Sequence, residues 1–128
     1  EKLKAERAEL ERERNPYGTP EAAFTTAYNA LRAGNWEKFL SSHSLRVREK
    51  AQDAAKERFL KSVERREVKG HVIKEVITNP ETPGEATLKV QLTVSYRRNA
   101  DGEREDEVRI ITVKLVKEGN KWLLDEDI

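Results

Sequence analysis

Few residues in this 128-residue chain have types and positions suited to acid–base chemistry. Tyr28 lies on the apolar side of a helical pattern, Tyr96 ends the apolar side of a strand pattern, and His71 shares the parity of Ile73 in another strand pattern. A proton shuttle in a buried hollow needs a carboxylate, histidine or tyrosine whose pKa is displaced by burial and by its neighbours. The patterns place no Asp–His or Asp–Tyr pair on an inward face, so we do not expect an enzyme.

The same residues fit a binding site for an apolar ligand. Aromatic side chains line pockets as well as fill cores, and Tyr and Trp carry a polar group that needs a partner. The candidate ligand-binding residues are the inward aromatic residues and one histidine: Phe24, Tyr28, His71, Tyr96 and Trp122. A place in the packed core is the alternative for each aromatic residue, and an edge position or a satisfied hydrogen bond is the alternative for His71.

Residue types exclude several other classes of site. The chain has no Cys, which excludes thiol catalysis, disulfides and Cys-based zinc sites. Its two histidines are too few for a metal centre made of His alone. Glycine-rich phosphate loops, Gly-x-Ser-x-Gly elbows and His-Glu-x-x-His motifs are absent from the sequence. We therefore expect no metal and no cofactor, and we expect His43, in the polar run 41–44, to be exposed in a loop or to cap a helix.

The charges are balanced, with 25 Lys and Arg against 24 Asp and Glu and a formal net charge of +1. Proteins that bind nucleic acid through its phosphates usually carry a clear basic excess, so nucleic acid is not an expected partner. Basic clusters occur at residues 46–50 and 65–69, but glutamates are interleaved with them, which predicts a solvated surface of mixed charge. No apolar run approaches about 18 residues, which excludes a transmembrane helix within this sequence.

The chain divides into a charged arm and one domain. Ten of residues 1–14 are charged, with opposite charges recurring three and four residues apart, which predicts a solvated helix or stalk. Asn15-Pro16-Tyr17-Gly18 ends that helix, because Pro cannot continue it. We therefore expect an arm over residues 1–16 and a domain over residues 17–128.

Three helices are expected at the start of the domain. Thr19 and Pro20 are typical of a helix start and Gly34 of a helix end, which predicts a helix over residues 20–33. A short helix follows over residues 36–41. Apolar residues spaced four apart predict a third helix over residues 47–63.

Four strands are expected after residue 66, where the apolar period changes from about 3.6 to 2: residues 68–78, 86–97, 105–117 and 121–125. The first has apolar residues on both parities, which is typical of a strand buried on both faces or interrupted by a bulge. In the third strand Val108 and Ile110 oppose the parity of Ile111, which predicts a bulge near residues 110–111. Asp101-Gly102 predicts a hairpin tip at residues 99–102.

Helices followed by strands in this order predict an α+β fold, with three N-terminal helices packed on a curved antiparallel sheet of about four strands, a cone. Residues 19–42, TPEAAFTTAYNALRAGNWEKFLSS, and residues 113–125, VKLVKEGNKWLLD, carry a resemblance to the nuclear-transport-factor-2-like superfamily, also called the cystatin-like α+β cone. Enzymes of that superfamily, such as ketosteroid isomerase, polyketide cyclases and dehydratases, place Asp, His or Tyr inside the cone. This chain departs from them, because its inward positions are mostly apolar.

Within the superfamily, the chain is most similar to small domains of unknown function in bacterial lipoproteins and other membrane-tethered envelope proteins. That resemblance implies a non-catalytic ligand-binding or protein-interaction domain of an exported or membrane-tethered bacterial protein, extracytoplasmic, with a tether upstream of Glu1. The expected partner is a hydrophobic small molecule or a protein. The polar outer face of the strand at residues 86–97 also permits a homodimer.

Several alternatives stay open. One is a small acid–base enzyme of the isomerase, cyclase or dehydratase type, which would act on a hydrophobic substrate through Tyr28, Tyr96 or His71. Another is an assembly or scaffold subunit that oligomerises through its N-terminal helix. A cytoplasmic location is the alternative to export. An engineered origin fits the absence of Met and Cys, although the uneven strands and the Pro-rich segment 79–84 argue against it.

Overall fold

The computed structural model describes residues 7, 14–51, 53–97 and 104–128. The expected arm, residues 1–16, lies largely outside these residues, and the expected hairpin tip at residues 99–102 lies entirely outside them. The elements of the domain follow one another in the order helices, then strands: α2 (Pro20–Arg32), α3 (Trp36–Ser41), α4 (Leu45–Lys50), α5 (Asp53–Arg65), β1 (Arg66–Asn79), β2 (Thr82–Arg97), β3 (Arg104–Glu118) and β4 (Lys121–Leu124).

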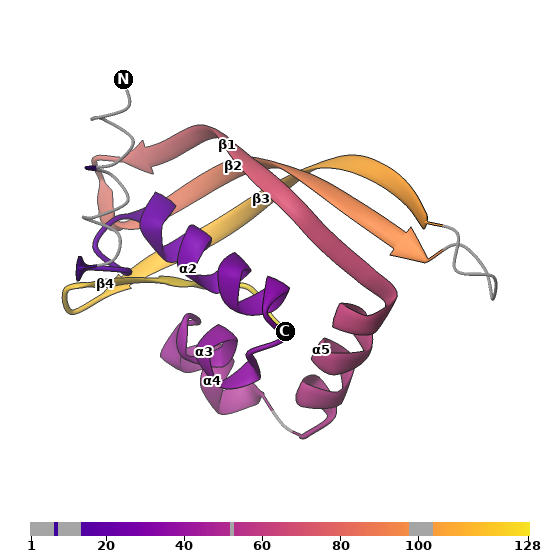
Figure 1. Ribbon diagram of the computed structural model, residues 1–128. Coiled ribbons are helices and arrows are strands. Elements are labelled where there is room, and N and C mark those ends of the chain that lie inside the picture. Colours follow the sequence, from indigo (N-terminus) through magenta and orange to yellow (C-terminus); the bar gives the residue numbers. More distant parts are fainter. Residues whose placement is uncertain (1–6, 8–13, 52, 98–103) are drawn as a thin grey trace.

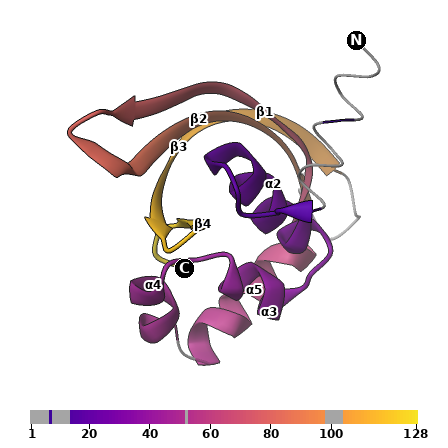
Figure 2. The ribbon, with the colours of Figure 1, turned by 90° about the vertical axis from the view of Figure 1, so that its left-hand side faces the viewer.

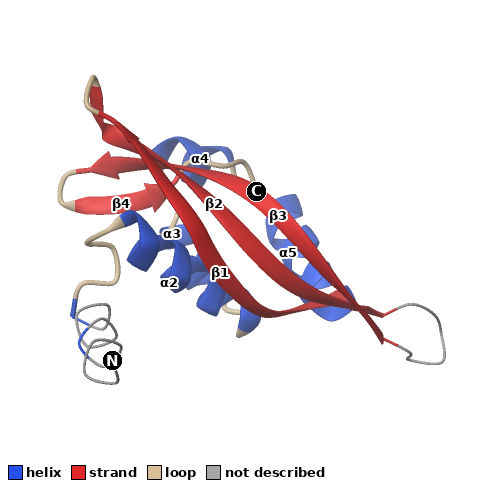
Figure 3. Cartoon of the chain, turned by 90° about the horizontal axis from the view of Figure 1, so that it is seen from above, coloured by secondary structure: helices blue, strands red, loops and turns tan. Residues whose placement is uncertain are grey.

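The four strands form one antiparallel sheet in the order β1-β2-β3-β4, so each strand pairs with its neighbour in sequence. The sheet curls around α2, which lies in its concave side, while α3, α4 and α5 close the open side (Figures 1 and 2). Seen from above, β1, β2 and β3 run diagonally across the whole molecule (Figure 3). The predicted α+β fold with a curved antiparallel sheet is confirmed.

Helix α2 supplies the centre of the core because its ends and its apolar face are both fixed by sequence. Thr19 caps the start by accepting a hydrogen bond from the Ala22 backbone N at 3.1 Å, and Gly34 adopts a φ of 68° after the end. Phe24 is fully buried at the middle of the helix. It packs in one core cluster with the inward side chains of the sheet, which include Leu88, Val90, Val113 and Leu115.

The prediction of a single third helix over residues 47–63 is wrong. The chain leaves the helical conformation at Ala51, whose ψ is 126°, and α4 and α5 are separate helices. Burial explains the break, because the two helices bury different residues in different places: Val47 on α4, and Phe59 on α5. The Phe59 ring packs against the aromatic residues of α3, 5.3 Å from the Trp36 ring and 4.9 Å from the Phe39 ring. The apolar spacing of four residues continues through this break, so the spacing alone did not predict it.

The two predictions of strand irregularity have opposite outcomes. In β1 the pairing with β2 shifts register at three places, between Val68 and Gly70, between Ile73 and Glu75, and at Thr78, so of the two alternatives for this strand the bulge is the one found. In β3 the pairing with β2 is unbroken from end to end, so the predicted bulge near residues 110–111 is wrong. Val108 and Ile110 instead lie on the outer face, 61% and 62% exposed. They break the apolar alternation because the outer face carries apolar side chains of its own.

Candidate functional site

Four of the five residues predicted to line a cavity pack in or against one core cluster, and the fifth, His71, contacts two of their rings. Phe24, Tyr28 and His71 form an aromatic cluster under the sheet, where the Tyr28 ring stacks on Phe24 at 4.1 Å and the His71 ring meets Phe24 edge-on at 5.2 Å. Phe24 and Tyr28 lie four residues apart on one face of α2, and His71 pairs with Leu92 on the inner face of the sheet. The three rings therefore meet between the helix and the sheet. Because Phe24 is fully buried in the packed core, this cluster fills the hollow.

Burial also sets the protonation of this cluster. Burial raises the pKa of the Tyr28 hydroxyl, with the Arg66 charge acting against that rise and the Glu126 charge adding to it. Burial lowers the pKa of His71, and the nearby Arg32 charge lowers it further. The His71 Nε2 lies 3.2 Å from the Thr25 hydroxyl, so its hydrogen-bond partner there is a hydroxyl and not a carboxylate. This arrangement keeps the imidazole and the phenol neutral near pH 7 and does not form the carboxylate–imidazole couple of a proton shuttle.

Trp122 takes a structural position at the β4 end of the sheet. Its ring is buried in the core cluster, and its backbone N donates to the carbonyl of Tyr17 at 2.8 Å. The Lys117 ammonium lies 6.0 Å from the ring centre. Trp122 thus joins the start of the domain to its last strand, which is the core alternative named for it above.

Tyr96 lies near the end of β2, where it packs against the edge of the same core cluster. The Arg109 guanidinium lies 5.2 Å from the centre of its ring, and the Tyr96 hydroxyl is buried with no hydrogen-bond partner. An open pocket of about 430 Å³ adjoins Tyr96 on the side of β3, where it is lined by charged residues: Glu105, Asp106, Glu107 and Arg109. Tyr96 therefore borders open space.

Residues 42–44 of the polar run at residues 41–44 are buried, against expectation. His43 is 3% exposed, and its Nδ1 donates to the Phe39 carbonyl at 2.7 Å. Its backbone pairs with Leu124 of β4 in an isolated bridge, which carries the chain through the interior. Burial lowers the pKa of His43, and the Phe39 carbonyl acts in the opposite direction. In the sequence this run has the polar composition of an exposed loop. Its burial depends on the C-terminal strand, which packs against it in the folded chain.

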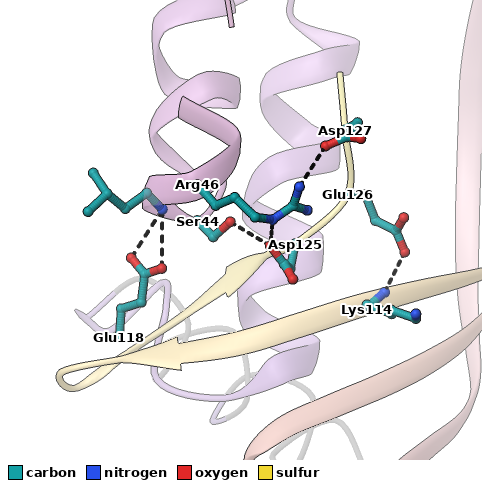
Figure 4. A network of polar contacts seen from close by, with 8 residues as sticks. Ser44, Arg46, Lys114, Glu118, Asp125, Glu126 and Asp127 are labelled. Carbon is teal, nitrogen blue, oxygen red and sulfur yellow. Dashed lines mark hydrogen bonds and ion pairs between the residues drawn. The ribbon is translucent and has the colours of Figure 1, made fainter. Parts of the chain in front are cut away.

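A polar network fastens the residues after β4 to the start of α4 (Figure 4). Ser44 donates to Asp125 at 2.8 Å, and the Arg46 guanidinium donates to Asp125 at 3.1 Å and to Asp127 at 3.0 Å. Partial burial raises the pKa of Asp125, but the hydrogen bonds from Ser44 and Arg46 outweigh it, so the pKa lies below its ordinary value. Each charge in the network is satisfied by another part of the network, which is typical of a structural role.

The outer, convex face of the sheet carries an exposed apolar patch, the "outer patch", made of Val72, Val108 and Ile110. Direct pairing places Val72, Gln91 and Ile110 in one row across three strands, and Gly70, Thr93 and Val108 in the next row. The three apolar side chains are 52%, 61% and 62% exposed. The sequence patterns did not predict the patch, although apolar residues on the second parity of these two strands were its signal.

Two ion pairs flank the outer patch. The Lys89 ammonium lies 3.7 Å from the Glu75 carboxylate in the row beside Val72, and the Lys69 ammonium lies 3.1 Å from the Asp106 carboxylate beyond Val108. The charges around the patch therefore cancel within the face. This gives an apolar centre with a neutral polar border.

Two other kinds of feature are absent from the described residues. No group of three or more His, Asp or Glu side chains in the described ranges is placed to hold a metal ion. Over the same residues, none of the helices combines the length and the apolar character that a membrane crossing requires.

Comparisons with known proteins give structural relatives only. No family model matches the chain, and no curated protein matches it. A SEC-C motif containing protein from Rhodopseudomonas palustris has a similar structure, with a TM-score of 0.67 at 14% identity, over 91% of this chain and 82% of that one. A putative calcium/calmodulin dependent protein kinase II association domain from Xanthomonas campestris gives a TM-score of 0.57 at 18% identity, over 81% of this chain and 79% of that one. At these identities the likeness shows the fold alone.

Proposed function

We propose that this chain is a non-catalytic protein-interaction domain that acts through the outer patch. The observation that carries the proposal is the exposure of Val72, Val108 and Ile110 in two adjacent rows of one sheet face, with Gln91 between Val72 and Ile110. Apolar side chains gathered in an exposed patch with a polar rim are typical of protein–protein contact sites. The inward face has no comparable role, because its apolar side chains are already packed against α2.

The partner that this face fits is a second copy of the chain. In a two-fold symmetric dimer a patch meets itself, so a patch with unpaired charge of one sign would repel its copy. Here the pairs Lys89–Glu75 and Lys69–Asp106 leave the border neutral, and the centre is apolar. Self-association is therefore compatible with the two ion pairs that lie beside the patch.

The size of the face sets the expected strength of the dimer. Three strands about 4.8 Å apart, over roughly ten residues of about 3.3 Å each, give a face of roughly 14 by 33 Å. That is smaller than the roughly 800 Å² per partner of a standard stable interface. We therefore expect a reversible dimer whose population depends on protein concentration.

Analytical ultracentrifugation over a hundredfold concentration range tests this proposal. The wild-type chain is expected to shift from monomer toward dimer as its concentration rises, and Ile110→Lys is expected to remain monomeric because it places a charge at the centre of the patch. Leu60→Lys is the matched control, since Leu60 is an exposed apolar residue on α5, away from the sheet face, and this variant should dimerise like the wild type. A wild-type chain that stays monomeric throughout, or an Ile110→Lys variant that dimerises normally, would overturn the proposal.

Two further parts of the proposal concern family and location. We propose membership of the nuclear-transport-factor-2-like superfamily, which the motifs at residues 19–42 and 113–125 support together with the curved sheet. We also propose that the domain belongs to an exported or membrane-tethered bacterial protein, which its Cys-free composition and charged arm support. Cell fractionation of the full-length protein tests the location, and recovery in the cytoplasmic fraction would contradict it.

A further inference from the structure

A groove lined by basic residues lies between α5, the start of β1 and the end of β2. It is an open pocket of about 360 Å³ on the concave side of the sheet, lined by the following residues: Arg58, Lys61, Ser62, Arg65, Arg66 and Tyr96. In Figure 1, α5 extends below the sheet and joins it through the start of β1. The groove thus lies on the face of the sheet opposite to the outer patch, and nothing in the proposed dimer uses it.

The basic residues of the groove converge because of helix geometry. Arg58, Lys61 and Arg65 lie at positions i, i+3 and i+7 of α5, with Ser62 at i+4, so all four project from one side of the helix. The acidic residues of α5 lie on the neighbouring flank: Asp53, Glu57 and Glu64. The interleaved sequence that predicted a surface of mixed charge is therefore sorted by the helix into a basic stripe and an acidic flank.

The charge of the stripe is largely uncompensated. Within the described ranges, no carboxylate lies within ion-pair distance of Lys61, Arg65 or Arg66, and the Arg58 guanidinium donates to the backbone carbonyl of Ile128 at 3.0 Å. Cations gathered at a concave surface without a counter-charge attract an anion, and the low-dielectric walls of a groove strengthen that attraction. The groove therefore favours a negatively charged group.

The floor of the groove is preorganised. The Arg66 Nε donates to the Ser62 hydroxyl at 2.7 Å, which holds this guanidinium in place, and Arg66 pairs directly with Tyr96 across β1 and β2. The Tyr96 hydroxyl is buried and has no hydrogen-bond partner. A buried hydroxyl without a partner is uncommon in folded proteins, and a bound group is one of its ordinary explanations. Tyr96 lines both this groove and the pocket beside β3, so its unpartnered hydroxyl lies where the two meet.

We propose that this groove binds a small anionic amphiphile, a molecule with a carboxylate or phosphate head group and an apolar body. The head group would lie among Lys61, Arg65 and Arg66, where the positive charge is concentrated. The walls are largely apolar, because the aliphatic stems of Arg and Lys and the ring of Tyr96 form them, and the apolar body would pack there. The volume lies in the range of ordinary small-molecule sites.

The probe for the test is 8-anilinonaphthalene-1-sulfonate, an anionic aromatic amphiphile whose fluorescence rises in apolar sites. The full chain is expected to bind it, and the double variant Lys61→Gln/Arg65→Gln is expected to bind at least tenfold more weakly. The matched control is Lys50→Gln/Lys56→Gln, which removes the same charge from α4 and from the other flank of α5 and should change the affinity less than twofold. Circular dichroism confirms that each variant is folded, so that binding of the dye to loosened protein is not counted.

Competition separates the two sources of the head group. Decanoate and octyl phosphate are each added to the dye complex, and displacement by either supports the proposal and identifies which head group the groove prefers. Inorganic phosphate at the same concentration should displace little dye, because it has no apolar body. Equal dye affinity in the two double variants, stronger loss in the control than in the groove variant, or displacement by inorganic phosphate as effective as by both amphiphiles would each overturn the inference.

Discussion

The hydroxyl of Ser44 donates a hydrogen bond to the carboxylate of Asp125 across 2.8 Å and thereby ties the start of α4 to the residue after β4. The two residues are 81 positions apart in the chain, and Ser44 is buried while Asp125 is partly exposed. The backbone repeats the connection, because the Ser44 N donates to the Leu124 carbonyl at 2.8 Å. The last strand is therefore held by the helical layer as well as by β3.

The first prediction concerns this tie. Ser44→Ala removes a hydrogen bond to a charged group and leaves part of the Asp125 carboxylate without its partner, so the free energy of unfolding should fall by about 1.5–3 kcal/mol. Ser41→Ala is the control, because the Ser41 hydroxyl is exposed and bonds only to the Lys38 carbonyl within its own helix. Urea unfolding measures both variants. A Ser44→Ala variant within about 0.5 kcal/mol of the wild type would show that the tie contributes little.

The second prediction concerns pH. Burial lowers the pKa of His43 in the folded protein below the ordinary value of about 6.5, so between those two values the unfolded chain binds more protons than the folded one. The contribution to stability is therefore present above pH 6.5 and is lost as the pH falls from 6.5 toward the folded pKa. Burial lowers the pKa of His71 in the same direction.

NMR titration of the imidazole protons checks this directly, with His43→Gln to assign the resonances. Both midpoints should lie below 6.5, and urea unfolding should show lower stability at pH 5 than at pH 7. The decrease should be smaller in His43→Gln, since that variant has one titrating group fewer. A His43 midpoint at or above 6.5 would be inconsistent with the buried position.

The third prediction compares two tyrosine hydroxyls. Tyr96→Phe removes a buried hydroxyl that has no partner, so the free energy of unfolding should stay the same or rise by up to about 1 kcal/mol. Tyr17→Phe removes a hydroxyl that lies 3.1 Å from the Ser42 Oγ, so it should lower the free energy of unfolding by about 1 kcal/mol. Thermal and urea unfolding of the pair decide the matter. Equal losses in the two variants would mean that the Tyr96 hydroxyl has a partner within the folded chain.

The sheet and α2 were predictable because their residues alternate or repeat with the period of the element that contains them. Leu88, Val90 and Leu92 face the core on one side of β2, and the cap at Thr19 marks the start of α2. The break at Ala51 was not predictable from period alone, because an apolar spacing of four residues continues through it. Which helix face is buried there depends on where α3 already lies.

The candidate site was less predictable than the fold. The patterns placed Phe24, Tyr28 and His71 on inward faces, and their rings pack together there. Whether they bind a ligand stays a prediction. The outer patch was interpreted as a bulge, since a single sequence does not separate a shifted register from an apolar outer face. The basic stripe of α5 requires the helix rotation that separates Arg58 and Arg65 from Glu57 and Glu64.

Helix α5 ends at Arg65 and β1 begins at Arg66, with no connecting loop between them. The helix and the first edge of the sheet are therefore mechanically continuous, and a tilt of α5 must rotate the first residues of β1 with it. Because Arg66 pairs with Tyr96, such a rotation would also reach the end of β2. Such a rotation would change the width of the basic groove, since α5 and the end of β2 both line it.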